Sequence, residues 1–161
     1  MLTPDLAKRI RAIFLHREPY VTKKEAAALL GWSVGQLKLA ISEGDIETYE
    51  TCAGVRIPLA EVAAIARERW QPAMIEEALG ADAVAILPAP LWTRTITVRL
   101  PRYQVAVLDH FAQKEGVTVD AIVARRVDGL MSEHSEDLAG VIEDFGVALN
   151  WPEPGDAQAR A

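Results

Sequence analysis

The chain has 161 residues, half of them hydrophobic, and a net charge of −6. This length allows one ordinary domain or two small ones, and the apolar content excludes a chain that is disordered throughout. A single cysteine, Cys52, excludes an internal disulfide, and no cysteine or histidine cluster has the spacing of zinc ligands. The start lacks the pattern of a signal peptide, and the longest apolar run, residues 83–92, contains two prolines and is too short to cross a bilayer. We therefore expect a cytoplasmic protein with no cofactor, no metal and no membrane association.

The charge is unevenly distributed along the chain. Residues 1–72 carry ten Lys or Arg and nine Asp or Glu, and residues 93–131 carry six basic and four acidic residues. Residues 73–92 carry three acidic residues, and residues 132–161 carry one basic residue against seven acidic ones. Two weakly basic modules and an acidic end indicate that different parts of the chain contact phosphates and another partner.

The first predicted element is a helix that begins after Thr3, with Pro4 at its first position. Its apolar face consists of Leu6, Ile10, Ile13 and Phe14. A second helix begins after Thr22, because Thr22 and Glu25 have the spacing of a capping box, and it ends near Leu30.

A tight turn at residues 31–33 leads to a third helix, which Ser33 caps and Gly44 ends. Two short helices joined by such a turn form a helix-turn-helix. The elements predicted next are two short strands and a closing helix, at 46–49, at 55–57 and from Pro58 onward.

Residues 20–70 resemble the excisionase-like winged helix-turn-helix family, which is related to the MerR type. The matching residues are Thr22, Glu25, Ala26, Ala27, Leu30, Gly31, Ser33, Leu37, Ile41, Gly44, Ile46, Arg56, Ile57, Pro58, Glu61 and Val62. The resemblance implies that the second helix of the pair enters the DNA major groove and that the wing touches the backbone or the minor groove. The DNA contacts it implies are Gln36, Lys38, Ser42 and Arg56.

The sequence departs from that family pattern in two places. Leu39 stands where the family often has arginine, and acidic residues surround the wing. These acidic residues are Glu43, Asp45, Glu47 and Glu50. Carboxylates near phosphates weaken DNA binding. The module is therefore either an autonomous DNA reader, or a weak reader or protein-contact domain.

Residues 73–92 allow two interpretations. In the first, they form a connector that contains one short helix near 73–79 and is rich in alanine and proline after it. Such a connector would let the two modules move relative to each other. Alternatively, their apolar side chains pack as part of the first domain. These side chains are Met74, Ile75, Leu79, Val84, Ile86 and Leu87.

Residues 95–100, Thr-Ile-Thr-Val-Arg-Leu, alternate between polar and apolar side chains as a half-buried strand does. A single strand leaves its backbone groups unpaired, so we expect the same strand of a second chain to complete it. In such a ribbon Ile96, Val98 and Leu100 point inward, and Thr95, Thr97 and Arg99 point outward together. A two-stranded ribbon fits the major groove, where threonine and arginine can hydrogen-bond base edges.

Residues 93–131 resemble the ribbon-helix-helix family of bacterial repressors and antitoxins. After the strand and Pro101, the matching positions are Val105, Leu108, Phe111, Ala112, Gly116, Ile122, Val123, Val127 and Leu130. Together with the inward strand positions, Leu108, Ile122 and Val127 are the expected dimer core. The backbone N–H groups of Val119 and Asp120, at the start of the second helix, are expected to hold a DNA phosphate.

Residues 132–161 form an acidic segment with one predicted amphipathic helix beginning at Ser135. Its apolar residues Leu138, Ile142, Phe145 and Leu149, with Trp151 beyond it, either dock on the chain itself or bind a groove of a basic partner.

The expected fold class is mainly α with short β-strands, comprising a winged helix-turn-helix domain and a ribbon-helix-helix dimerisation domain. The three histidines fall on separate elements and no catalytic motif accompanies them, so we do not expect an enzyme. The first functional hypothesis is a DNA-binding antitoxin, acting as a homodimer or higher even oligomer that represses its double-stranded DNA operator and binds a toxin through its acidic segment. The alternatives are a regulator or mobile-element DNA-architecture factor without a toxin, and a protein-only adaptor on degenerate DNA-binding folds.

Overall fold

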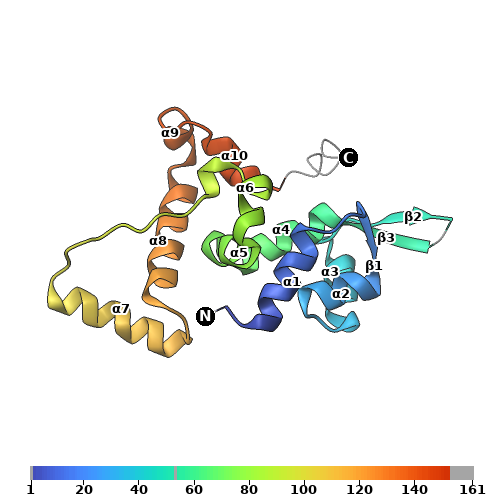
Figure 1. Cartoon of the computed structure of the whole chain (residues 1–161), viewed down its shortest axis with the longest axis horizontal. Helices are drawn as coiled ribbons and strands as arrows, with labels where there is room; N and C mark the ends of the chain where they lie inside the picture. The colour runs from blue at the N-terminus through green and yellow to red at the C-terminus, as the bar shows by residue number, and fades with distance from the viewer. Residues whose placement is uncertain (1, 53, 153–161) are drawn as a thin grey trace. The chain divides into compact units, whose positions relative to one another are not determined.

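The computed structural model describes residues 2–52 and 54–152. These residues fall into two compact units (Figure 1). The N-terminal unit contains residues 2–92 together with 150–152, and the inserted unit contains residues 93–149. The fold is mainly helical with one small antiparallel sheet, as the sequence predicts. The chain leaves the N-terminal unit after Trp92 and returns to it at Asn150.

Local capping signals place the first helices of the N-terminal unit. Thr3 caps α1 (Pro4–Phe14) by accepting a hydrogen bond from the backbone N–H of Leu6 at 3.3 Å, and Pro4 occupies the first turn. The α2 helix (Lys23–Leu30) begins with a complete capping box. In that box the Thr22 hydroxyl accepts from the Glu25 N–H at 3.2 Å, and the Glu25 carboxylate accepts from the Thr22 N–H at 2.8 Å.

A tight turn joins α2 to α3 (Val34–Glu43). Gly31 ends α2 at φ +66° and Gly44 ends α3 at φ +86°, a left-handed conformation that glycine adopts without strain. Ser33 caps α3, as predicted, and Gln36 completes a second capping box. The two helices pack against each other and bury Leu30 and Leu37.

The sheet has three strands in the order β1, β3, β2, all antiparallel. The strands are β1 (Tyr20–Thr22), β2 (Tyr49–Thr51) and β3 (Gly54–Pro58). The sequence did not predict β1, and it placed a strand at 46–49 where β2 begins only at Tyr49. Ile46 is buried ahead of the strand instead. Val21 pairs with Ile57 across β1 and β3, and both side chains point into the core.

Residues 59–91 complete the N-terminal unit. Their elements are α4 (Leu59–Arg69), α5 (Pro72–Leu79), η1 (Gly80–Asp82), α6 (Ala83–Ile86) and η2 (Ala89–Leu91). Of the two interpretations of residues 73–92, the structure agrees with packing in the first domain, because α5 lies against α1. The side chains buried there are Ile75, Ala78, Leu79, Ala83, Leu87 and Leu91, whereas Val84 stays 70% exposed.

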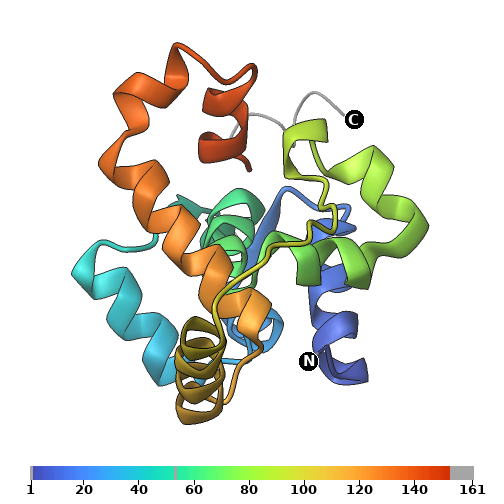
Figure 2. The ribbon, with the colours of Figure 1, turned by 90° about the vertical axis from the view of Figure 1, so that its left-hand side faces the viewer.

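The inserted unit is built around a helical hairpin (Figure 2). The helices are α7 (Arg102–Glu115) and α8 (Val119–Glu133), which contact each other across a turn at Gly116, φ +67°. Thr118 caps α8 by accepting from the Ala121 N–H at 3.2 Å. The expected strand at 95–100 is extended chain without an assigned strand, because no backbone partner lies within the described residues.

The predicted continuous helix from Ser135 to Leu149 is wrong. Two short helices, α9 (Ser135–Ala139) and α10 (Phe145–Asn150), take its place. Gly140 follows α9, and Asp144 lies before α10 with φ +57°, which a continuous right-handed helix does not permit. The predicted 153–161 end of the acidic segment lies outside the described residues.

Candidate nucleic-acid and dimer interface

The extended segment 95–100 exposes apolar side chains along its length. Ile96 is 70% exposed, Val98 67% and Leu100 42%. No backbone hydrogen bond joins residues 94–100 to any residue in the described ranges. A segment of this kind needs a partner for both its backbone and its apolar face.

The three polar side chains of the segment are also exposed. Thr95, Thr97 and Arg99 make no hydrogen bond or ion pair with residues that the structure describes. They alternate with the apolar positions, so an extended backbone places them together on the opposite face. The predicted DNA-reading residues are therefore available on one chain to an outside ligand.

The helical hairpin of the inserted unit has very little core of its own. Of the predicted dimer-core positions on the helices, Ile122 is 7% exposed, Leu108 is half-buried and Val127 is 47% exposed. Large apolar side chains that stay exposed on α7 and α8 are Tyr103, Val105, Val107, Phe111, Val123, Val127 and Leu130. So much exposed apolar surface on a two-helix hairpin is typical of an interface.

The start of α8 offers two backbone donors. The N–H groups of Val119 and Asp120 lie in the first turn, where no intrahelical acceptor exists, and make no hydrogen bond within the described ranges. Such donors favour an anion, whereas the Asp120 carboxylate beside them repels one. A phosphate site here stays a prediction.

Two of the three predicted DNA contacts on α3 form hydrogen bonds to the helix or to its cap. The Gln36 side chain accepts from the Ser33 N–H at 2.8 Å, and the Ser42 hydroxyl donates to the Leu39 carbonyl at 2.7 Å. Lys38 is exposed and makes no hydrogen bond or ion pair within the described residues. Leu39, with 57% of its surface exposed, lies beside it. The free surface of α3 is therefore partly apolar.

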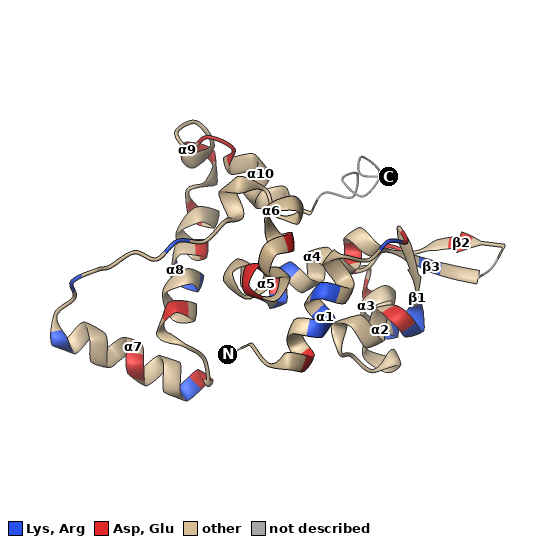
Figure 3. Ribbon diagram, in the orientation of Figure 1, with Lys and Arg blue, Asp and Glu red and all other residues tan. Residues whose placement is uncertain are grey.

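Arg56, the predicted wing contact, is half-buried on β3 opposite Thr22 and Tyr49. The hydrogen bond from the Thr22 backbone N–H is the main cause that lowers the pKa of Glu25, and the charges of Arg56 and His16 lower it further. Acidic residues lie on β2 and around it, as Figure 3 shows for the ribbon. The positive charge of Arg56 is thus partly offset by a neighbouring carboxylate.

Some of the predicted partner-binding residues of the acidic segment are buried within the chain itself. Phe145 and Trp151 are 4% and 6% exposed, and Leu138 is half-buried. Ile142 and Leu149 are 47% and 39% exposed. Sequence reasoning missed Val141 and Val147, which are 83% and 46% exposed. Of the predicted anchors, only Ile142 and Leu149 present a large exposed surface.

Sequence reasoning also missed an aromatic pair on the outer face of the sheet. Tyr20 and Tyr49 meet edge to face with ring centroids 6.1 Å apart, and they are 46% and 50% exposed. Tyr20 on β1 and Tyr49 on β2 are brought together because both strands pair with β3, and the sequence did not predict β1.

The part of the chain that the structure describes contains no group of three or more His, Cys, Asp or Glu arranged to hold a metal ion. None of its helices combines the length and the apolar character needed to span a bilayer. Protein-family models, curated proteins and solved structures were all compared with the chain, and none of them matches it.

Proposed function

We propose that the chain is a sequence-specific DNA-binding transcriptional regulator that acts as a homodimer or higher even oligomer. Residues 95–100 of two copies pair as an antiparallel ribbon, which buries Ile96, Val98 and Leu100 and presents Thr95, Thr97 and Arg99 to the major groove. The observation that carries this proposal is the unpaired, alternating segment in front of a hairpin with an exposed apolar face.

The N-terminal unit supplies a second, weaker contact in this proposal. It has the helix order of a winged helix-turn-helix, with Lys38 free on α3, but Leu39 and the acidic wing reduce its attraction for phosphate. A dimer carries two such units, so weak contacts add through a raised effective concentration. The exposed Leu39 also favours the adaptor alternative, in which α3 contacts a protein.

The acidic segment is the proposed contact for a toxin. Residues 132–152 contain five Asp or Glu and no Lys or Arg, and Val141, Ile142 and Val147 are exposed among them. An acidic surface with apolar anchors fits a partner with a basic groove. Changing Val141 and Ile142 to Asp should remove a co-purifying toxin and leave DNA binding intact. A regulator without a toxin would show no such partner.

Selection from a random duplex library with the full chain tests the DNA-binding proposal. We expect an enriched motif, and for Arg99→Ala a loss of about 1–3 kcal/mol, roughly 5- to 150-fold in affinity, if Arg99 pairs with a base. The matched control is Arg17→Ala, which removes an exposed arginine from the N-terminal unit. No enriched motif, or equal effects of the two substitutions, would contradict base reading by the ribbon.

A further inference from the structure

Trp151 is held by both its side chain and its backbone. Its indole stacks on Phe14, with ring centroids 5.3 Å apart and the planes 12° from parallel. Its carbonyl accepts a hydrogen bond from Nη1 of Arg67. Phe14 belongs to α1 and Arg67 to α4, two helices that pack against each other. The residue is only 6% exposed.

These contacts are specific rather than general apolar burial. An offset aromatic stack contributes beyond the area it buries, and an arginine bond to a main-chain carbonyl fixes the direction of the chain at that residue. The Phe14 ring and the Arg67 guanidinium thus contact the ring and the carbonyl of the same residue.

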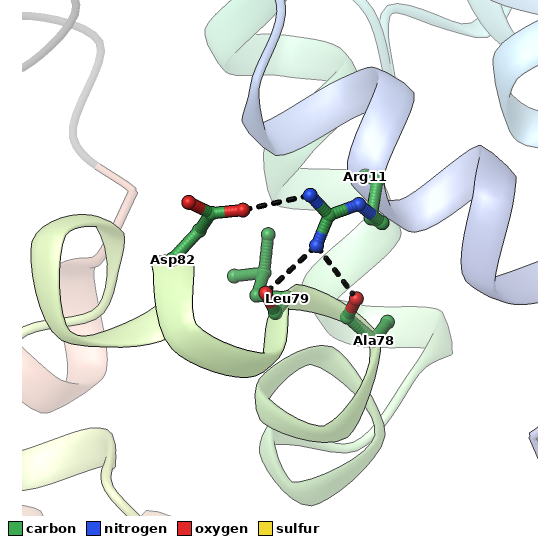
Figure 4. A network of polar contacts seen from close by, with 4 residues as sticks. All are labelled: Arg11, Ala78, Leu79 and Asp82. Carbon is green, nitrogen blue, oxygen red and sulfur yellow. Dashed lines mark hydrogen bonds and ion pairs between the residues drawn. The ribbon is translucent and has the colours of Figure 1, made fainter.

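Helix α1 also binds the end of α5 and the η1 turn through Arg11 (Figure 4). Arg11 lies one turn before Phe14, and its Nη1 donates to the carbonyls of Ala78 and Leu79 at 3.2 and 2.7 Å. Its Nη2 pairs with the Asp82 carboxylate at 2.7 Å. The chain is therefore fixed to α1 at residues 78–82, ahead of the inserted unit in sequence, and again at Trp151, after it.

We infer that Phe14 and Arg67 form a docking site for Trp151, which closes the chain's own C-terminal segment onto the N-terminal unit. The chain is then held by the N-terminal unit both before and after residues 93–149, at residues 78–82 and at Trp151. Any partner that uses Trp151 as an anchor has to compete with Phe14 for the same ring. The docking does not depend on whether the chain binds DNA.

A double-mutant cycle in the full chain tests the docking. Phe14→Ala and Trp151→Ala should each lower the melting temperature by about 5–10 °C, and the double variant should fall clearly less than the sum, because one stack is lost in all three. Val147→Ala, a truncation of an exposed residue in the same segment, is the control and should change little. Additive effects, or no effect of Trp151→Ala, would overturn the inference.

Trp151→Phe provides a second test in a protein that keeps an aromatic ring at the site. Subtracting the emission of the Trp151→Phe variant from that of the wild-type chain gives the contribution of Trp151. We expect this contribution to be blue-shifted and poorly quenched by acrylamide, as for a buried indole. A contribution that is red-shifted and quenched as readily as free tryptophan would show that the residue is undocked in solution.

Discussion

Arg11 and Phe14 lie one turn apart on α1 and bind two segments far apart in the sequence. Arg11 binds the carboxyl end of α5, and Phe14 stacks on Trp151. A single helix therefore anchors the chain on both sides of the inserted unit. Substitutions on α1 should consequently affect stability through distant segments as well as through the core.

Arg11→Ala should lower the free energy of unfolding of the N-terminal unit by about 1–2 kcal/mol. It removes two hydrogen bonds to carbonyls at a helix end and one ion pair, and the side chain is 43% exposed, which reduces the effect. Asp82→Asn removes the ion pair alone and should cost less than about 1 kcal/mol. Urea unfolding measures both. A larger effect for Asp82→Asn than for Arg11→Ala would contradict this assignment.

The capping box of α2 should make stability depend on pH in the acid range. The pKa of Glu25 in the folded chain lies below its ordinary value of 4.5, chiefly because its carboxylate accepts from the Thr22 N–H. Its contribution is therefore present above pH 4.5 and disappears as the pH falls through the lower folded value. The stability difference between wild type and Glu25→Gln should shrink as the pH falls below 4.5. Lys24→Gln, which removes no carboxyl group, is the control, and a constant Glu25→Gln difference would disprove the linkage.

Gln36 and Lys38 should separate the structural and the DNA-contacting roles of α3. Gln36→Ala opens a capping box and should lower stability by about 0.5–1 kcal/mol. Lys38→Ala removes a free cation and should weaken DNA binding and reduce its salt dependence, with little change in melting temperature. If Lys38→Ala leaves DNA affinity unchanged, α3 does not contact DNA, and the alternative in which it contacts a protein gains support.

Ile96 and Val84 form a matched pair for testing self-association, because each is 70% exposed on the single chain. Ile96 belongs to the proposed ribbon, whereas Val84 lies on α6 of the N-terminal unit. Ile96→Asp should shift the sedimentation of the chain from dimer to monomer at micromolar concentration, since a charge cannot be buried unpaired in the ribbon core. Val84→Asp should leave the dimer unchanged. Equal behaviour of the two variants would refute the ribbon as the site of association.

The sequence predicted well those parts of the fold that depend on neighbouring residues. The caps at Thr3, Thr22 and Ser33 involve partners three residues away, so their spacing alone locates the helix starts. The predicted apolar positions Ile10, Ile13 and Leu37 are all buried. The caps follow from the three-residue spacing, and the buried positions follow from helical periodicity.

Features that depend on distant residues escaped prediction. The three residues of β1 become a strand only because β3 pairs with them, and the Trp151 ring stacks on Phe14, which lies 137 positions earlier in the chain. The apolar spacing of Leu138, Ile142, Phe145 and Leu149 resembles one helix, yet the backbone at Asp144 interrupts it. The alternation of residues 95–100 is local and can be seen in the sequence, whereas the partner strand and the DNA-contacting role of these residues stay predictions.

A cysteine scan across residues 95–99 in a Cys52→Ser background tests the central claim most directly. In an antiparallel ribbon of identical strands, residues next to the twofold axis face their own copies closely enough to form a disulfide, and residues further from it do not. We predict efficient covalent dimer formation at one or two positions, with a sharp decline on either side. Absence of cross-linking at all five positions, or equal cross-linking at every one, would contradict pairing of the segment with a second copy.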